Sequence, residues 1–276
     1  MKSTNHEPYW DIIERIIKES DLVLEILDSR LVELSRNKEV ERLVEEIGRP
    51  LIYVINKSDL VSKESIKNQI TNLKKKGEVV FISTKENNIK ILLYTIKKVF
   101  NKFGKSEKIK TEEKPKYRET RSDIVVGVLG YPNVGKSSII NRLSHKKKVK
   151  VSKKSGTTHG IQWVKVSNDI KLIDSPGVIP LERDDDIRYG LIGAKDTEAL
   201  KNPEIVAHAV IKLFLIKNKK NFEELYKIEL KSNDVLDIIE EIGIKKGHLL
   251  KKGKVDENRV CSMIVRDWQQ GRLRLS

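Results

Sequence analysis

The sequence predicts an α/β domain with a mostly parallel sheet and helices on both faces, followed by a small all-α domain. Short apolar runs alternate with helix-length amphipathic stretches through the first two thirds of the chain. That alternation is typical of a parallel sheet covered by helices. After residue 186 the strand-like runs stop and only helical patterns follow. We therefore expect two domains, at residues 1–187 and 188–276.

Continuous runs of Val, Ile and Leu mark the strands that are buried on both faces, because such strands lack a polar side. One further segment, Ile161–Ser167, alternates apolar and polar residues directly before a strand. Alternation indicates one solvated face, so we expect an antiparallel strand at the sheet edge there. The expected parallel strands are Asp21–Asp28, Pro50–Asn56, Val79–Ser83, Ile124–Gly130 and Ile170–Asp174.

Amphipathic stretches of helical length separate these strands and fill the second domain. The expected helices of the first domain are Tyr9–Glu19, Lys38–Ile47, Glu64–Lys76, Ile89–Lys102 and Lys136–Leu143. Those of the second are Asn202–Lys217, Phe222–Lys227, Ser232–Ile242 and Glu257–Gln270. Within the first domain, between the third expected strand and the strand that leads into Gly130, residues 102–121 are mostly charged, contain Pro115 and lack an apolar period, so they are predicted to be a solvated linker.

The composition limits the function. A net charge of +15 favours a polyanionic partner, with nucleic acid as the first candidate. A thermophile surface would also explain the high charged fraction, but not its positive excess. The single cysteine excludes an intrachain disulfide framework, and no apolar run approaches the roughly 20 residues that span a bilayer. The N-terminus lacks the apolar core of a secretory signal. We expect a cytoplasmic protein with no membrane partner.

The segment from Gly130 to Ser137 fits the phosphate-loop pattern, with an apolar strand before it and a helix after it. Its backbone N–H groups and the helix N-terminus would surround phosphates. Lys136 would reach the β- and γ-phosphates, and the Ser137 hydroxyl would ligate Mg²⁺. The expected phosphate-binding residues are Asn133, Val134, Gly135, Lys136, Ser137 and Ser138.

A second motif, Asn-Lys-Ser-Asp at residues 56–59, ends an apolar strand. There Asp59 could accept hydrogen bonds from the N1 and N2 donors of guanine, a pair that adenine lacks. Taken alone, the tetrapeptide could be a strand-end turn. Ser-Thr-Lys at residues 83–85 follows the next strand and is the expected third contact with the base. The expected base-binding residues are Asn56, Lys57, Asp59, Ser83, Thr84 and Lys85.

The third motif, Asp-Ser-Pro-Gly at residues 174–177, also follows an apolar run. Asp174 suits the Mg²⁺ shell through water, and the Gly177 N–H suits the γ-phosphate. Thr158 lies between the phosphate loop and this motif, so we assign it to Mg²⁺ and the γ-phosphate, with Thr157 as the alternative. Either threonine could instead sit in a surface turn. The expected metal ligands are therefore Ser137, Thr158 and Asp174.

The three motifs occur in an unusual order along the chain. An ordinary GTPase has the phosphate loop first and Asn-Lys-x-Asp late, whereas here residues 56–59 precede residues 130–137, and residues 174–177 come last. A circular permutation explains this order, because all the loops can still meet on one face of a sheet while the chain ends move elsewhere. The last motif then lies next to the second domain.

This motif order, together with Asp28-Ser29-Arg30 near the start, resembles the circularly permuted GTPases of the ribosome-assembly family. The resemblance covers nearly the whole chain. It implies a GTP hydrolase that binds GTP, GDP and Mg²⁺ and acts on the maturing large ribosomal subunit. Ribosomal RNA would be the main contact, and no DNA partner is expected. Unlike the family pattern, Asp28-Ser29-Arg30-Leu31 lacks an alanine and a nearby proline, which puts the shape of that loop in question.

The residue that activates water stays open. Val178 stands where signalling GTPases carry a water-orienting glutamine, and valine cannot orient a water. The resemblance implies three substitutes: K⁺ held by Asn133, an element of the ribosome, or a histidine near the N-terminus, here His6. His159 is a further alternative. The candidate catalytic residues are thus Lys136, Thr158, Gly177, Asn133 and His6.

Lysine runs at residues 146–154 and 245–254 are candidate phosphate contacts for RNA, together with Arg266, Arg272 and Arg274. Each run could equally be a solvated face. Trp268 could stack on a base, although its helical spacing from Ile264 is more typical of a core residue. Two rival functions stay open: a GTPase that assists tRNA modification, and a GTP-sensing RNA-binding module with negligible turnover.

Overall fold

The computed structural model describes residues 8–62, 64–83, 85, 88–105, 123–144, 162–174 and 185–275. The chain divides into two compact units. The first unit contains Met1–Ser58 and Ile66–Pro180, and the second contains Asp59–Ser65 and Leu181–Ser276. The expected domain limits at residues 187 and 188 stay a prediction. That Asp59–Ser65 belongs with the helical part of the chain was not predicted.

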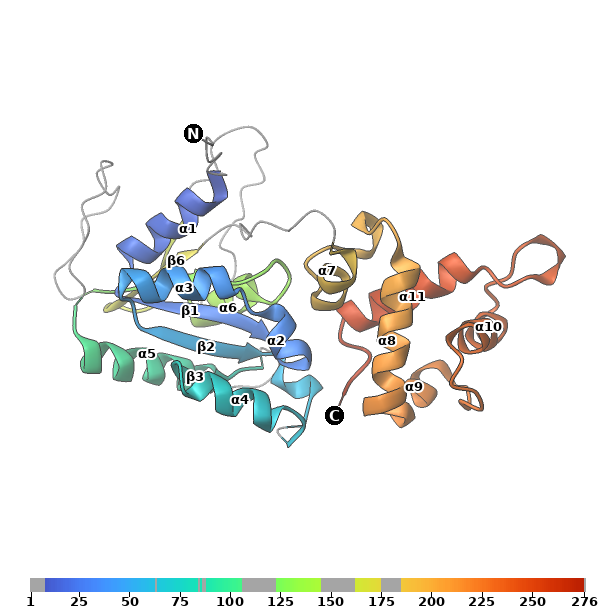
Figure 1. Ribbon diagram of the computed structural model, residues 1–276. Helices are drawn as coiled ribbons and strands as arrows, with labels where there is room; N and C mark the ends of the chain where they lie inside the picture. The colour runs from blue at the N-terminus through green and yellow to red at the C-terminus, as the bar shows by residue number, and fades with distance from the viewer. Residues whose placement is uncertain are drawn as a thin grey trace. The chain divides into compact units, whose positions relative to one another are not determined.

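The first unit is built on a six-stranded sheet in the order β3-β2-β1-β4-β6-β5 (Figure 1). All neighbouring strands are parallel except β5, which runs antiparallel to β6 at the edge. The strands are β1 (Leu22–Asp28), β2 (Leu51–Asn56), β3 (Glu78–Phe81), β4 (Ile124–Leu129), β5 (Gln162–Lys165) and β6 (Ile170–Asp174). The predicted parallel sheet with its antiparallel edge strand is confirmed.

Hydrophobic burial explains why β1 and β4 occupy the middle of the sheet. Every residue of both strands is buried, and all except Glu25, Asp28 and Gly127 are Val, Ile or Leu. Each such side chain contributes about 1.5–3 kcal/mol when it leaves water. The edge strand β5 has only one buried residue, Val164, which accounts for its alternating sequence.

The first unit's helices lie against this sheet, with α1 and α3 on one side and α5 on the other (Figure 1). They are α1 (Pro8–Glu19), α2 (Val32–Ser35), α3 (Lys38–Ile47), α4 (Lys67–Lys74), α5 (Ile89–Phe103) and α6 (Lys136–Leu143). Helix α4 is shorter than expected because Glu64–Ile66 forms a 3₁₀ turn. The four-residue α2 was not predicted, since one helical turn shows no period in a sequence.

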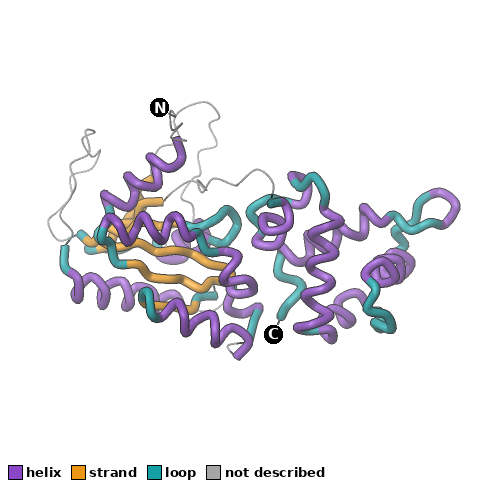
Figure 2. Tube along the Cα trace, viewed as in Figure 1, coloured by secondary structure: helices purple, strands orange, loops and turns teal. Residues whose placement is uncertain are grey.

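In the second unit the described residues form helices and loops without a strand (Figure 2). Helix α8 packs against both α11 and α7. The helices are α7 (Asp186–Ile192), α8 (Pro203–Lys217), α9 (Lys219–Tyr226), α10 (Val235–Lys246) and α11 (Glu257–Gln269). The two-turn α7 was not predicted. No described helix is long and apolar enough to cross a membrane.

Trp268 is a core residue of the second unit and not a stacking platform. Its side chain is fully buried, and its ring meets Phe214 edge to face with 5.9 Å between centroids. Its indole N–H donates to the Leu191 carbonyl at 2.6 Å. This bond ties α11 to the end of α7. The guanidinium of Arg272 pairs with Asp267 at 3.0 Å, so its charge is already partly compensated.

The segment Asp59–Ser65 is held in the second unit by residues that follow α11. The Leu275 N–H donates to the Leu60 carbonyl at 2.9 Å, and Leu60 and Leu273 are both buried. Gly271 has a φ of +71°, and a Cβ there would stand 3.0 Å from Leu60 Cδ1. Segment 271–275 thus fixes the residue that directly follows Asp59 in the chain.

Candidate functional site

The carboxyl ends of four parallel strands bring the described parts of the predicted site to one edge of the sheet. Strand β2 ends at Asn56, β4 leads into the phosphate loop, and β6 ends at Asp174. Asp28, at the end of β1, pairs in register with Asn56, and Val128 pairs with Asp174. Ligands of open α/β sheets bind at this edge. The order of the strands places the base motif and the phosphate motif on opposite sides of β1.

The phosphate loop has the backbone that its sequence predicts. Gly130 has a φ of +146°, and a Cβ on it would lie 2.7 Å from the Ile26 carbonyl oxygen. Gly135, with a φ of +104°, caps α6. Asn133 adopts the left-handed φ of 60° without being glycine, a conformation that typically marks functional loops. The loop therefore passes close to β1 and turns sharply into the helix.

Lys136 is folded onto its own loop. Its Nζ donates to the carbonyls of Gly130 at 2.6 Å and Tyr131 at 2.7 Å. Burial lowers the pKa of Lys136 to about 8, although the charge of Asp174 opposes the shift. Burial likewise raises the pKa of Asp174 to about 6, opposed by Lys136. The two side chains are therefore electrostatically coupled at the end of β6.

Asn56 joins the base motif to the phosphate loop. Its Nδ2 donates to the Val134 carbonyl at 2.8 Å. A Cβ on Gly135 would lie 2.1 Å from the same Nδ2, so only glycine leaves room for this side chain. The Asn56 Oδ1 atom is buried and has no hydrogen-bond partner among the described residues. Two motifs that lie far apart in the sequence are thus in direct contact.

Asp28-Ser29-Arg30 holds Lys57, a role that the sequence did not reveal. The buried Asp28 carboxylate accepts from Arg30 Nη2 at 2.7 Å and from Lys57 Nζ at 2.8 Å. The Ser29 hydroxyl donates to the Lys57 carbonyl at 2.7 Å, and Lys57 has a left-handed φ of 58°. Burial would raise the pKa of Asp28, but the charges of Arg30 and Lys57 outweigh it and hold that pKa far below its usual value.

The other base-side residues follow β2 and β3. The Ser58 N–H donates to the Ile82 carbonyl at 3.1 Å, and the buried Ser83 hydroxyl accepts from the Lys85 N–H at 3.2 Å. Asp59 is half-buried in the 3₁₀ turn Ser58–Leu60. Ser83 and Lys85 thus form a small turn beside the start of the Asp59 motif.

A polar network lies behind the phosphate loop. Asn37 Nδ2 donates to the Tyr131 hydroxyl at 3.2 Å, and the Asn37 N–H donates to Glu25 Oε1 at 2.8 Å. Burial, reinforced by the charge of Glu41, raises the pKa of Glu25 to about 8. Because Tyr131 is the second residue of the loop, this network connects α3 to the loop. Glu25, an acidic residue in the middle of an apolar run, was the sequence signal that could have predicted this network.

Several expected site residues lie outside the described residues: His6, Thr84, Thr157, Thr158, His159, Gly177 and Val178. Their predicted roles stay predictions. The same holds for the lysine run at residues 146–154. Ser137 and Ser138 are exposed in the first turn of α6, the position that the phosphate-loop pattern requires.

Comparison with known proteins supports the reading of the motifs. A family model described as "50S ribosome-binding GTPase" matches residues 125–250. The fold is similar to GNP-bound YlqF from T. maritima, a circularly permuted GTPase, with a TM-score of 0.61 at 20% identity. That match covers 96% of this chain and 95% of the other. The chain therefore has the fold of a circularly permuted GTPase.

Relatives of this permuted GTPase occur in all three domains of life. It is 36% identical to an uncharacterized GTP-binding protein of Methanocaldococcus jannaschii, across 96% of this chain and 66% of that protein. It is 28% identical to ribosome biogenesis GTPase A of Priestia megaterium, across 91% and 86%. Nucleolar GTP-binding protein 2 of Pneumocystis carinii is 32% identical, across 96% and 52%. The chain spans about half to two thirds of the relatives matched first.

The site of this permuted GTPase fits a guanine nucleotide with Mg²⁺. The glycines at 130 and 135 leave a loop without side chains in the way of phosphates. The Asp174 Oδ1 atom is buried without a hydrogen-bond partner among the described residues, so a carboxylate oxygen is available to a cation. Hard oxygen donors such as Asp174 and the Ser137 hydroxyl suit Mg²⁺.

Arg30→Met tests whether Asp28 holds the site together. It leaves the buried carboxylate with Lys57 as its one cation and the residue 30 backbone N–H as a neutral donor, so we expect unfolding free energy to fall by about 3 kcal/mol, as when other buried ion pairs are broken. Guanine-nucleotide affinity should fall as well. Urea unfolding and nucleotide titration measure the two effects. The control is Arg42→Met, whose exposed pair with Glu46 spans 3.6 Å and should change stability by no more than about 0.5 kcal/mol. Equal stability of both variants would contradict the role of Asp28.

Proposed function

We propose that this protein is a GTP hydrolase that assists assembly of the large ribosomal subunit and binds ribosomal RNA in a nucleotide-dependent way. The observation that carries the proposal is the meeting of Asn56, the phosphate loop and Asp174 at one sheet edge. The description of the matching family and the name ribosome biogenesis GTPase A support the ribosomal part. The positive charge of +15 supports RNA as the partner.

Guanine would be selected by Asp59, whose carboxylate accepts from two donors that adenine does not present. Segment 271–275 restrains Leu60, the residue after Asp59, while Ser29 and Asp28 restrain Lys57, two residues before it. Because Asp59 is restrained on both sides, it would lose little conformational freedom when guanine binds, which favours selective binding of guanine over adenine. Ser83, Thr84 and Lys85 would complete the base site.

The phosphates would lie on the loop backbone and the first turn of α6. Lys136 would exchange its two loop carbonyls for phosphate oxygens and so neutralise charge that develops during hydrolysis. Mg²⁺, held by Ser137 and Thr158 with Asp174 acting through water, would supply electrostatic stabilisation of the phosphates. Gly177 would contribute its N–H to the γ-phosphate.

Val178 leaves the attacking water without a side chain to orient it, so intrinsic turnover would be slow. Asn133 stands in a left-handed turn of the phosphate loop, which makes it the candidate ligand for K⁺. His6, His159 or an element of the ribosome are the alternatives for water activation.

RNA would contact the second unit at a basic loop between α10 and α11, which we define as residues 247–254. An isolated bridge between Leu249 and Val255 closes this loop, and the Leu250 N–H donates to the Lys254 carbonyl at 2.7 Å. Lys251, Lys252 and Lys254 are exposed there. An ordered loop presents cations at a lower entropic cost than a disordered run. A large-subunit precursor, cytoplasmic localisation and the absence of DNA and membrane partners belong to the same proposal.

Sedimentation with large ribosomal subunits tests the function directly. We expect the protein to sediment with subunits in GTP and in a non-hydrolysable analogue, and to be released in GDP, because nucleotide and RNA affinities are linked. Lys251→Gln with Lys254→Gln should weaken this binding, whereas Lys212→Gln with Lys217→Gln on exposed positions of α8 should not. Deleting residues 181–276 is unsuitable, because it would also expose Leu60. The proposal would be contradicted if the protein did not sediment with subunits, or if it did so equally in GTP and GDP.

Asp59→Asn should weaken GTP binding and admit xanthine nucleotides, because an amide donates to the xanthine O2 atom where a carboxylate cannot. Titration of both nucleotides measures the exchange of preference. Asp234→Asn, a change of the same kind at the N-cap of α10, is the control and should leave the guanine preference intact. An unaltered preference in Asp59→Asn would remove this residue from the base site.

GTP turnover should be slow in Na⁺ and rise with K⁺ or with added large subunits, since Val178 orients no water. Asn133→Ala should abolish the K⁺ response while GTP still binds. Asn141→Ala, on the exposed side of α6, should retain the response. Release of phosphate is the measurement, and rapid hydrolysis by the isolated protein in Na⁺ alone would show that another residue activates the water.

A further inference from the structure

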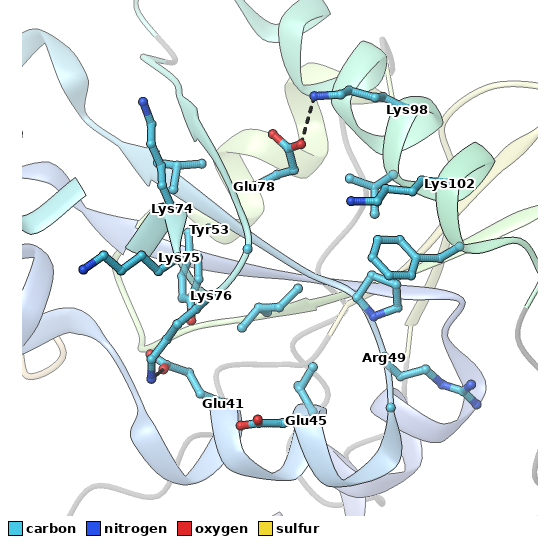
Figure 3. Close-up of a pocket in the computed structure, with 18 residues that line it drawn as sticks. Glu41, Glu45, Arg49, Tyr53, Lys74, Lys75, Lys76, Glu78, Lys98 and Lys102 are labelled. Carbon is cyan, nitrogen blue, oxygen red and sulfur yellow. Dashed lines mark hydrogen bonds and ion pairs between the residues drawn. The ribbon is translucent and has the colours of Figure 1, made fainter. Parts of the chain in front are cut away.

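A large groove lies in the first unit at the sheet edge opposite the nucleotide motifs (Figure 3). It is formed where β2 and β3 begin, at Leu51 and Glu78, and where α3, α4 and α5 end. Its volume is about 820 Å³. All of its lining residues belong to the first unit. Because the nucleotide motifs follow the other ends of these strands, a ligand in the groove and a nucleotide would not compete for space.

Cations outnumber carboxylates around this groove. Six basic residues and three acidic ones line it, which gives the lining a net charge of +3. The basic residues come from three separate segments of the chain, which converge here only through folding. They are Arg49, Lys74, Lys75, Lys76, Lys98 and Lys102. The helix dipole explains why a cation is favourable at each helix C-terminus. It does not explain why the cations of several helix ends lie around one groove.

Two of the three carboxylates are already neutralised by close partners. Glu41 is buried and accepts from Arg36 at 2.6 Å and 2.7 Å. Burial would raise the pKa of Glu41, but the hydrogen bonds and charge of Arg36 outweigh it and lower that pKa. Glu78 pairs with Lys98 at 2.9 Å, as Figure 3 shows. Arg36 does not line the groove, whereas Lys76, which does, lies 3.4 Å from the same carboxylate, so Lys76 is left out of the cations that remain.

The positive charge that remains lies on exposed lysines at the rim. Within the described part of the chain, Lys74 and Lys75 make no ion pair, and Lys102 makes none besides its contact with the Phe103 ring. All three are exposed. Exposed ammonium groups retain their hydration and mobility. They are therefore better suited to binding a flexible anion than to binding a rigidly held carboxylate. A chain of phosphates is such an anion, and binding it releases counterions.

An aromatic ring lies beside one of these lysines, Lys102. Phe103, at the end of α5, is 60% exposed, and Lys102 Nζ lies 5.3 Å from its ring centroid. An exposed phenyl ring beside cations is the arrangement that single-stranded nucleic acids use, with bases on aromatic faces and phosphates on basic side chains. Duplex RNA hides its bases and would leave the ring unused.

We propose that this groove binds a single-stranded segment of RNA, with its phosphates on Lys74, Lys75 and Lys102 and a base stacked on Phe103. The inference rests on the proposed function, because it assigns part of the RNA contact to the first unit. RNA would then meet the protein at two surfaces, this groove and the basic loop at residues 247–254. Nucleotide can stay bound at the opposite edge while the groove is occupied.

The test uses the full chain and a fluorescein-labelled single-stranded RNA of mixed sequence, with affinity measured by anisotropy over a series of KCl concentrations. Removing the three rim charges with K74Q, K75Q and K102Q should lower the slope of log affinity against log salt by about 2, at roughly 0.7 per phosphate contact. Affinity at low salt should fall tenfold or more.

The matched control is K38Q, K67Q and K90Q. It removes three exposed lysines near the N-terminal ends of α3, α4 and α5, the helices whose C-terminal ends form the groove. It changes the net charge equally, so a general charge effect would appear in both triple variants. The slope should change far less in this control. Binding of a fluorescent GDP derivative, unchanged in both variants, reports that the first unit is folded.

Phe103→Leu separates stacking from charge. It keeps an apolar side chain but removes the ring, and affinity for single-stranded RNA should fall about tenfold, as when other stacking platforms are lost. Tyr94→Leu is the control, because Tyr94 is 71% exposed on the same helix and does not line the groove. Duplex RNA of the same sequence should bind equally to Phe103→Leu and the unaltered protein.

The outcomes distinguish this inference from the proposed function. If both triple variants lose the same affinity, or Phe103→Leu binds as before, the groove is not an RNA site, while GTP-dependent sedimentation with subunits would still support the proposed function. If the groove variants bind RNA normally but no longer sediment with subunits, the occupant is a protein and the inference is wrong. If the unaltered protein binds neither subunits nor RNA, both proposals fail.

Discussion

The buried carboxylate of Asp28 is the charge around which the nucleotide edge is organised. A carboxylate without partners in the centre of a sheet would cost several kcal/mol, so Arg30 and Lys57 must stay where they neutralise it. Lys57 then fixes the turn after β2, and Asn56 reaches the phosphate loop through the Val134 carbonyl. The geometry of the whole edge depends on this one desolvated charge, which explains why β1 is central and yet ends in an acid.

Circular permutation is tolerated because the sheet is defined by pairing and not by the order of synthesis. Strand β1 pairs with β2 on one side and β4 on the other. The strands that lead into the base motif (β2) and into the phosphate loop (β4) therefore share β1 as their common neighbour. Parallel strands place all their carboxyl ends at one edge whatever connects them. The chain can therefore begin with the base half, provided that a connection such as residues 102–121 bridges the gap between α5 and β4.

Much of the fold could be predicted because the strands are continuous apolar runs and the motifs sit at their ends. Boundaries were less certain: Ser83 lies beyond the end of β3, and α4 begins three residues late. Features that depend on tertiary contact were missed. No local pattern shows that Arg30 neutralises Asp28, that Trp268 donates to Leu191, or that Leu60 packs against segment 271–275. The groove was not predicted for the same reason, because its lysines come from segments whose sequences resemble ordinary solvated helix ends.

The hydrogen bond between Leu275 and Leu60 also constrains how the protein matures. During translation residue 60 emerges long before residue 275, so the nascent chain exposes the Leu60 side chain and leaves the Asp59 turn without this contact. The sheet and the phosphate loop can form before the Asp59 turn gains its contact with residues 271–275, which follow the helices of the second unit. The turn that contains Asp59 is therefore completed late in biosynthesis, once the helices of the second unit have folded.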